Sequence, residues 1–233
     1  MNPNFSSDSV EKLMSLVRPS MNYSDLSDAD LVIEAVFENI GIKREVFTEL
    51  SKVVKPDTIL ASNTSSISIT SISSGMEGSE RILITHFFNP PYTLPLVEVV
   101  PSLLTNDLIV KKTVQFLSGL KNHRGNLVPV EVKESPGFVV NRMLVPMINE
   151  GIFLLDEGVA SREDIDLAMK KGAGMPMGPL ELADMVGFDV TLDVCNLFYE
   201  QYGDQKYRPS VLLKRMVDAG YLGKKTGRGF YSY

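Results

Sequence analysis

The chain has 233 residues, of which 44% are hydrophobic and 22% charged, the composition of an ordinary globular protein with a sizeable core. The net charge of −6 gives no basis for binding nucleic acid, and no apolar run approaches the ~20 residues of a membrane span. One cysteine and two histidines exclude an internal disulfide and leave too few ligands for a zinc site. We expect a cytoplasmic protein that binds no nucleic acid, membrane or metal.

The first half of the chain alternates between helix and strand patterns. Residues 8–18 carry apolar side chains at helical spacing, and Pro19 ends that helix. Short apolar runs then alternate with amphipathic stretches, as in parallel sheets whose strands are buried on both faces. We expect strands at 30–36, 58–62, 82–87, 94–100 and 127–132, with helices between them at 41–54, 68–75 and 105–120.

This alternation predicts a doubly wound, Rossmann-like α/β sheet, in which ligands bind outside the carboxyl ends of the strands. When such sheets bind dinucleotides, they open with a strand, a G-x-G-x-x-G turn and a helix. Residues 1–29 contain no glycine. We therefore expect an incomplete sheet without the N-terminal Gly-rich segment, an exposed apolar edge at 30–36, and weak dinucleotide binding by this chain.

After residues 135–137 (S-P-G) the strand patterns stop and helical patterns follow. Ser161 and Asp164 have the spacing of a capping box, which starts one of these helices. We expect helices at 138–158, 161–172, 179–202 and 209–219. The chain is therefore expected to divide into an incomplete Rossmann-like domain, residues 1–133, and an all-α domain, residues 134–233.

His86 and Glu98 are the residues that most strongly suggest chemistry. His86 ends a predicted buried strand, where a packed histidine would be the commoner finding. Glu98, however, lies in the apolar run P-L-V-E-V-V, where a carboxylate is costly unless it is paired or functional. A carboxylate beside an imidazole orients the ring and stabilises its protonated form, which suits a general base. A buried pair with a purely structural role remains the alternative.

Other polar residues lie where predicted strands or domains end. Ser65 follows a strand within S-N-T-S-S and suits a hydrogen bond to a ligand, although a polar turn or helix cap is the simpler interpretation of these residues alone. Asn141 interrupts an apolar helix and needs a partner, either structural or on a substrate. Glu38 and Lys43 flank the turn after the first strand and, by composition alone, form a solvated charge pair.

The order of these motifs resembles the 3-hydroxyacyl-CoA dehydrogenase family, particularly its 3-hydroxybutyryl members. The resemblance covers roughly residues 10–233 and is specific because the motifs occur together in one order. They are D-A-D-L-V-I-E-A-V-F-E-N (28–39), I-L-A-S-N-T-S-S (59–66), T-H-F-F-N-P (85–90), L-V-E-V-V (96–100), S-P-G-F-V-V-N-R (135–142), G-A-G-M-P-M-G-P-L-E-L-A-D (172–184) and G-K-K-T-G-R-G-F-Y (223–231).

The resemblance implies NAD-dependent oxidation of a (3S)-3-hydroxyacyl-CoA to the 3-oxoacyl-CoA, in fatty acid or butanoate metabolism. His86 would be the catalytic base and Glu98 would orient it, while Ser65 and Asn141 would hydrogen-bond the substrate. Ser65 would also lie near NAD. Further implied contacts to NAD come from Glu38, Lys43, Asn89 and Lys225. The helical domain would close the site and form a homodimer interface.

One stretch departs from the family pattern. Residues 120–131 (L-K-N-H-R-G-N-L-V-P-V-E) are about five residues longer than the family's turn at this point, and the extra segment is 121–126. His123 lies in it, and we expect no catalytic role for this residue. The insertion precedes the expected domain boundary.

Three alternatives to a complete dehydrogenase stay open. The chain could be a non-catalytic dimerisation or coenzyme-binding remnant, or one part of a split dehydrogenase. It could also act on a hydroxy acid other than an acyl-CoA thioester. The sequence fixes neither acyl chain length nor the choice between NAD and NADP, because the acid that discriminates the two cofactors belongs to the Gly-rich segment.

Overall fold

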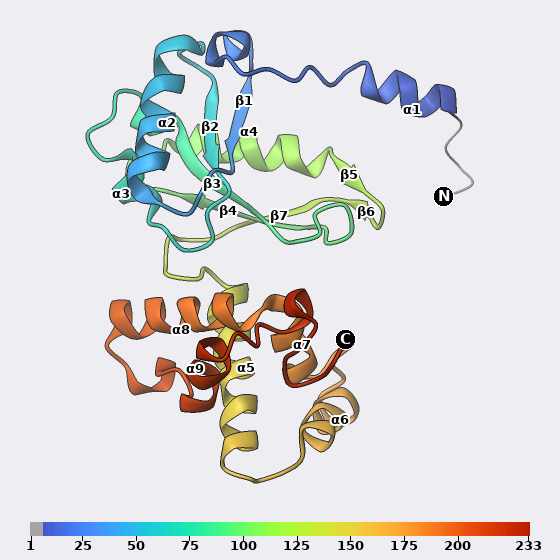
Figure 1. Ribbon diagram of the computed structural model, residues 1–233. Helices are drawn as coiled ribbons and strands as arrows, with labels where there is room; N and C mark the ends of the chain where they lie inside the picture. Colours follow the sequence, from blue (N-terminus) through green and yellow to red (C-terminus); the bar gives the residue numbers. More distant parts are fainter. Residues whose placement is uncertain (1–6) are drawn as a thin grey trace.

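A computed structural model describes residues 7–233, so the first six residues of the expected first domain lie outside it. Helices flank a five-stranded sheet in residues 7–131, here called the α/β part. A bundle of helices follows in residues 140–233, here called the helical part, and the connecting segment passes from one to the other once (Figure 1). The expected fold class, a Rossmann-like sheet followed by an all-α region, is confirmed.

The sheet has the strand order β1-β2-β3-β4-β7. Strands β1 to β3 are parallel, β4 runs antiparallel to β3, and β7 is parallel to β4. The sequence patterns did not predict the reversal at β4. Its cause is the short connection at 88–95, because a parallel crossover needs about a dozen residues or more. The strands are Leu31–Glu34 (β1), Ile59–Ser62 (β2), Ile82–Phe87 (β3), Leu96–Pro101 (β4) and Val128–Glu131 (β7).

Helices cover both faces of the sheet, as the apolar runs predicted. Helices α2 (Ile40–Val53) and α3 (Ile69–Ser73) pack on one face, and α4 (Asp107–Ser118) packs on the other. Successive side chains of a strand point to opposite faces, so Leu60 packs toward α2 while Ala61 packs toward α4. The two faces thus have separate apolar cores, and the central strands are fully buried.

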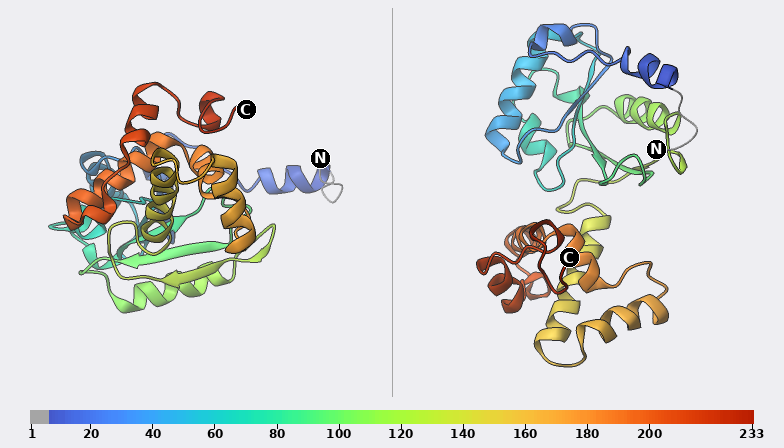
Figure 2. Two further views of the ribbon diagram at one scale, coloured as in Figure 1. Left: turned by 90° about the horizontal axis from the view of Figure 1, so that it is seen from below. Right: turned by 45° about the vertical axis from the view of Figure 1, so that its right-hand side comes forward.

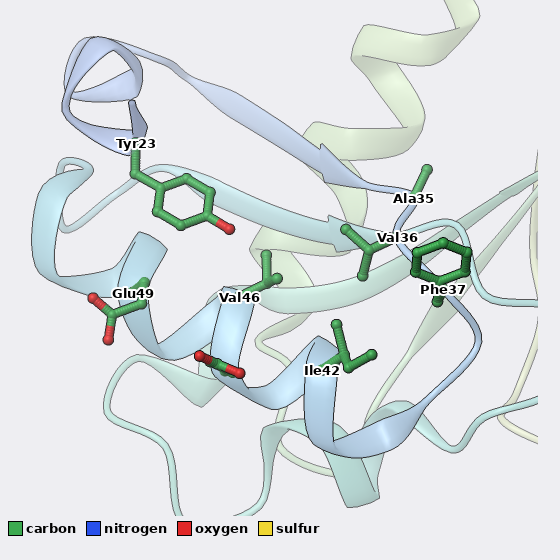
Figure 3. A pocket seen from close by; sticks show the side chains of 8 residues that line it. Tyr23, Ala35, Val36, Phe37, Ile42, Val46 and Glu49 are labelled. Atoms are coloured by element: carbon green, nitrogen blue, oxygen red, sulfur yellow. The ribbon is translucent and has the colours of Figure 1, made fainter. Parts of the chain in front are cut away.

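β1 forms one edge of the sheet, and this edge is apolar and open. Ile33 is 42% exposed and Phe37, just beyond the strand, 83% exposed. An apolar groove lies on each side of the strand, one toward α2 and one toward α4. Figure 3 shows the first, between the end of β1 and α2, lined by Tyr23, Ala35, Val36, Phe37, Ile42, Glu45, Val46 and Glu49. Helix α1 (Ser7–Met14) extends away from the sheet (Figures 1 and 2), so the apolar face expected for 8–18 is not buried in it.

The helical part contains five α-helices within the described residues. The single helix expected at 179–202 is wrong, because the chain breaks at Gly187, whose φ is 101°. That backbone conformation lies outside a helix and suits glycine. Apolar residues continue at helical spacing through the break, so the sequence pattern did not reveal it. The helices are Val140–Asp156 (α5), Arg162–Gly172 (α6), Pro179–Val186 (α7), Phe188–Tyr202 (α8) and Val211–Asp218 (α9).

Residues 121–126, the segment expected to be an insertion, form a hairpin of their own. Strands β5 (Lys121–Asn122) and β6 (Gly125–Asn126) pair antiparallel. The hairpin rests on the connection between β3 and β4, because the backbone N–H of His123 donates to the carbonyl of Tyr92 at 3.0 Å. The next strand, β7, pairs regularly with β4, so the hairpin does not interrupt the main sheet.

The single cysteine, Cys195, lies in α8 and packs against Val145, Phe198 and Tyr207. Burial raises the pKa of its thiol to about 12. Because the thiolate is the reactive form, this cysteine is a core residue rather than a nucleophile. Within residues 7–233, no helix has the length and apolarity needed to cross a membrane.

Candidate active site

His86 and Glu98 are cross-strand neighbours on adjacent strands of the sheet. His86 lies on β3 directly opposite Glu98 on β4, and their side chains share one face. Imidazole Nδ1 lies 2.8 Å from Glu98 Oε2, and both side chains are buried. Since Nδ1–H donates to the carboxylate, Nε2 is the nitrogen left to accept a proton.

The second oxygen of Glu98 reaches the helical part. Oε1 accepts the backbone N–H groups of Val139 and Val140, at 3.0 and 3.1 Å. These groups belong to the first turn of α5, where N–H groups have no partner within the helix and favour a negative charge. One buried carboxylate therefore fixes the histidine ring and the start of α5 together.

Two phenylalanines enclose the His86 ring. The Phe88 ring centroid lies 4.5 Å from that of His86, and the Phe138 ring meets it edge-on at 5.5 Å. Phe138 has a φ of 49°, a strained conformation for a residue with a side chain. The preceding Gly137 allows a close approach, because a Cβ there would lie 2.2 Å from Phe198. The surrounding packing therefore sustains a strained turn that places an aromatic ring against the imidazole, and no sequence pattern indicated this turn.

Ser65, Asn89 and Asn141 remain available for a ligand. Ser65 and Asn89 follow the carboxyl ends of β2 and β3, and Asn141 lies in the first turn of α5. Within residues 7–233, none of these three side chains makes a hydrogen bond to another residue of the chain. The ends of β2 and β3 are joined by Asn63, whose Oδ1 accepts the N–H of Phe87 at 3.0 Å.

Glu38 and Lys43 do not form the solvated pair that composition suggested. Lys43 is only 1% exposed, and its Nζ lies 2.8 Å from Glu34 and 3.2 Å from Glu38. Glu38 also accepts hydrogen bonds from the hydroxyls of Thr64 and Ser66. The buried Glu34 was missed, although its position in the apolar run D-L-V-I-E-A-V is the same signal that singled out Glu98.

The Glu38 carboxyl is stabilised in its ionised form. Partial burial opposes ionisation, but the hydroxyls of Thr64 and Ser66 and the charge of Lys43 outweigh it and lower the pKa of Glu38. A carboxyl with a lowered folded-state pKa adds stability above its ordinary pKa and loses it as the pH falls through the lowered value.

We therefore expect Glu38→Gln to lower the melting temperature at neutral pH, with the difference shrinking as the pH falls below the ordinary carboxyl pKa of 4.5. Thermal melts of both proteins across these pH values check the prediction. A melting difference that grows on acidification would contradict it.

Lys225 lies apart from the sheet-edge residues, in the C-terminal segment of the helical part. Its Nζ is held by the carboxylate of Asp189, near the start of α8. Within the described chain it makes no ion pair with Glu34 or Glu38. The structure therefore brings together His86 and Glu98, and separately Glu38 and Lys43, but it does not bring Lys225 to either group.

Two family models cover almost the whole chain. The 3-hydroxyacyl-CoA dehydrogenase NAD binding domain matches residues 2–135, and the C-terminal domain of the same family matches residues 137–233.

Individual relatives agree. A 3-hydroxybutyryl-CoA dehydrogenase of Clostridioides difficile is 48% identical over 222 residues, covering 95% of this chain and 77% of the relative. The mitochondrial hydroxyacyl-coenzyme A dehydrogenase of Homo sapiens is 43% identical, covering 96% and 70%. The crystal structure of (S)-3-hydroxybutyryl-CoA dehydrogenase from Ralstonia eutropha superposes with a TM-score of 0.91 at 42% identity, covering 98% and 79%. The chain thus belongs to the 3-hydroxyacyl-CoA dehydrogenase family, a family of NAD-dependent oxidoreductases.

Proposed function

We propose that this protein oxidises a (3S)-3-hydroxyacyl-CoA to the 3-oxoacyl-CoA with NAD as the hydride acceptor. The observation that carries the proposal is the buried His86–Glu98 pair, whose carboxylate also holds the start of the helical part. His86 Nε2 takes the proton of the 3-hydroxyl group, and the resulting imidazolium is stabilised by Glu98. Bound NAD supplies the acceptor for the hydride that leaves C3. Ser65 and Asn141 position the substrate oxygens.

The residues at the sheet edge fit a dinucleotide. Ser65 and Asn89 offer a hydroxyl and an amide without partners in the described chain. Glu38 offers a half-exposed carboxylate able to accept from ribose hydroxyls. The proposed dinucleotide contacts also include Lys43 and Lys225. Lys43 Nζ lies 3.2 Å from Glu38, and Lys225 is paired with Asp189. We therefore assign Glu38 the direct contact to the dinucleotide and Lys43 a supporting one.

The assay follows the loss of NADH absorbance and compares two substrates, acetoacetyl-CoA and free acetoacetate. We expect turnover with the thioester and little with the free acid. Equal turnover of the two would favour a dehydrogenase for another hydroxy acid. Thioester binding without turnover would favour a non-catalytic module. Varying the NADH concentration in the same assay gives KM for NADH.

We further propose a cytoplasmic homodimer formed through the helical part, with domains at 1–133 and 134–233. The last sheet strand ends at Glu131 and α5 begins at Val140, which supports that division. Met143 and Met185 of the helical part are 73% and 55% exposed, and such apolar side chains suit an interface between two copies. Sedimentation equilibrium would give twice the chain mass, and a monomer would contradict this assignment.

A further inference from the structure

Glu34, the last residue of β1, is a buried carboxylate, and both of its oxygens accept hydrogen bonds. Oε1 accepts from Lys43 Nζ at 2.8 Å and from the backbone N–H of Val36 at 2.6 Å. Oε2 accepts from the hydroxyl of Ser62, the last residue of β2, at 2.7 Å. Glu34 therefore joins the ends of two parallel strands and the first turn of α2.

Burying this charge is costly, which separates Glu34 from an ordinary strand residue. Two charges taken out of water gain little over a well-packed apolar pair of similar volume, whereas one charge left alone is strongly unfavourable. Fold stability by itself would be served by apolar residues at both positions. The arrangement also does something an apolar pair cannot, because it holds the Lys43 ammonium group against the end of β1.

From there Lys43 reaches the exposed side of the same edge. Its Nζ lies 3.2 Å from Glu38 Oε2, while Glu38 Oε1 accepts from the hydroxyls of Thr64 and Ser66. One cation thus lies between two carboxylates. Glu34 shares the lysine charge, so Glu38 stays bonded to both hydroxyls and keeps a net negative charge toward the ligand side.

We propose that Glu34 is a positioning residue for cofactor binding, acting through Lys43 on Glu38. The inference rests on the proposed function, because Glu38 is there assigned to the dinucleotide. Without the Glu34 charge, Lys43 has a single carboxylate partner and draws Glu38 toward itself. The orientation of the Glu38 carboxylate then changes, and cofactor affinity falls while the His86–Glu98 pair, on strands β3 and β4, is untouched.

The test is Glu34→Gln, which keeps the size and hydrogen-bonding oxygen but removes the charge. We expect KM for NADH to rise about tenfold, with kcat and KM for acetoacetyl-CoA within about twofold of wild type. Asp30→Asn is the matched control, since Asp30 precedes the same strand but pairs with Lys55 on the surface. It should leave all three constants unchanged. An unchanged KM for NADH in Glu34→Gln would overturn the inference.

A double variant separates positioning from a purely structural role. Lys43→Met removes the cation, so adding Glu34→Gln to it leaves the buried site neutral and should recover melting temperature lost in Glu34→Gln alone. KM for NADH should nevertheless stay high and change by less than about twofold on adding Glu34→Gln to Lys43→Met. Recovery of NADH affinity together with stability would show that Glu34 acts only on folding and would overturn the proposal.

Failure of this inference is distinguishable from failure of the proposed function. If Lys43→Met and Glu38→Gln leave NADH affinity unchanged, the cofactor assignment itself is wrong.

Discussion

Replacing His86 by alanine is expected to lower kcat about a thousandfold, with KM for acetoacetyl-CoA changed little. General acid–base catalysis by a positioned side chain contributes about 10²- to 10⁴-fold, and no other histidine lies at the sheet edge to substitute. In the proposed reaction run in the reductive direction, His86 as imidazolium would return its proton to the 3-oxo oxygen. Steady-state assays of NADH loss with wild type and His86→Ala measure the effect.

The chain supplies its own control, because its second histidine lies outside the candidate site. His123 belongs to the β5–β6 hairpin, where its ring meets Tyr92 edge-on. His123→Ala should keep kcat within about twofold of wild type, since surface changes rarely exceed small effects. If His86→Ala retained most of the activity, or if both variants lost it equally, the assignment of His86 as base would be wrong.

Glu98→Gln is expected to lower kcat by more than about a hundredfold, although it changes a single atom. Where the glutamine NH₂ group faces Nδ1, it donates to that nitrogen, and the ring proton moves to Nε2, which can then no longer accept. Where the amide is flipped, its NH₂ group faces the N–H groups of Val139 and Val140, and the start of α5 is pushed away. A neutral acceptor also stabilises the imidazolium less.

The matched control for Glu98→Gln is Glu131→Gln on the neighbouring strand β7. Glu131 is exposed and stands beside Val99 in the same sheet, so its substitution removes a charge without touching the histidine. The melting temperatures of both variants show whether activity is lost through chemistry or through unfolding. Wild-type activity in Glu98→Gln would mean that the buried pair has a structural role only.

The sequence predicted both the buried strands and the His86–Glu98 pair, because both predictions depend on recognising apolar runs. A carboxylate in an apolar run is too costly to be accidental, so Glu98 pointed to a partner on the adjoining strand. Glu34 gave the same signal, but its partner Lys43 lies nine positions away with Arg44 beside it. The sequence pattern did not distinguish which of Lys43 and Arg44 pairs with the buried Glu34. The structure shows Arg44 bonded instead to backbone carbonyls at the end of α3.

Other features depend on contacts that no local pattern encodes. Buried parallel and antiparallel strands have the same apolar run, so only the length of the 88–95 connection distinguishes them. The bonds from Val139 and Val140 to Glu98 join a backbone and a carboxylate about forty positions apart. Gly187 interrupts a continuous apolar stripe, and the stripe dominated the prediction of one long helix where two exist.

The burial of Cys195 makes this protein convenient for spectroscopy. With its only native thiol enclosed by α5 and α8 and its pKa raised to about 12, the wild-type chain should take up almost no maleimide at neutral pH. A cysteine introduced at the exposed Arg124, at the tip of the hairpin, would then be the sole site for a dye or spin label. A second label on the helical part would turn the distance between the two parts into a measurable signal, without first engineering a cysteine-free background.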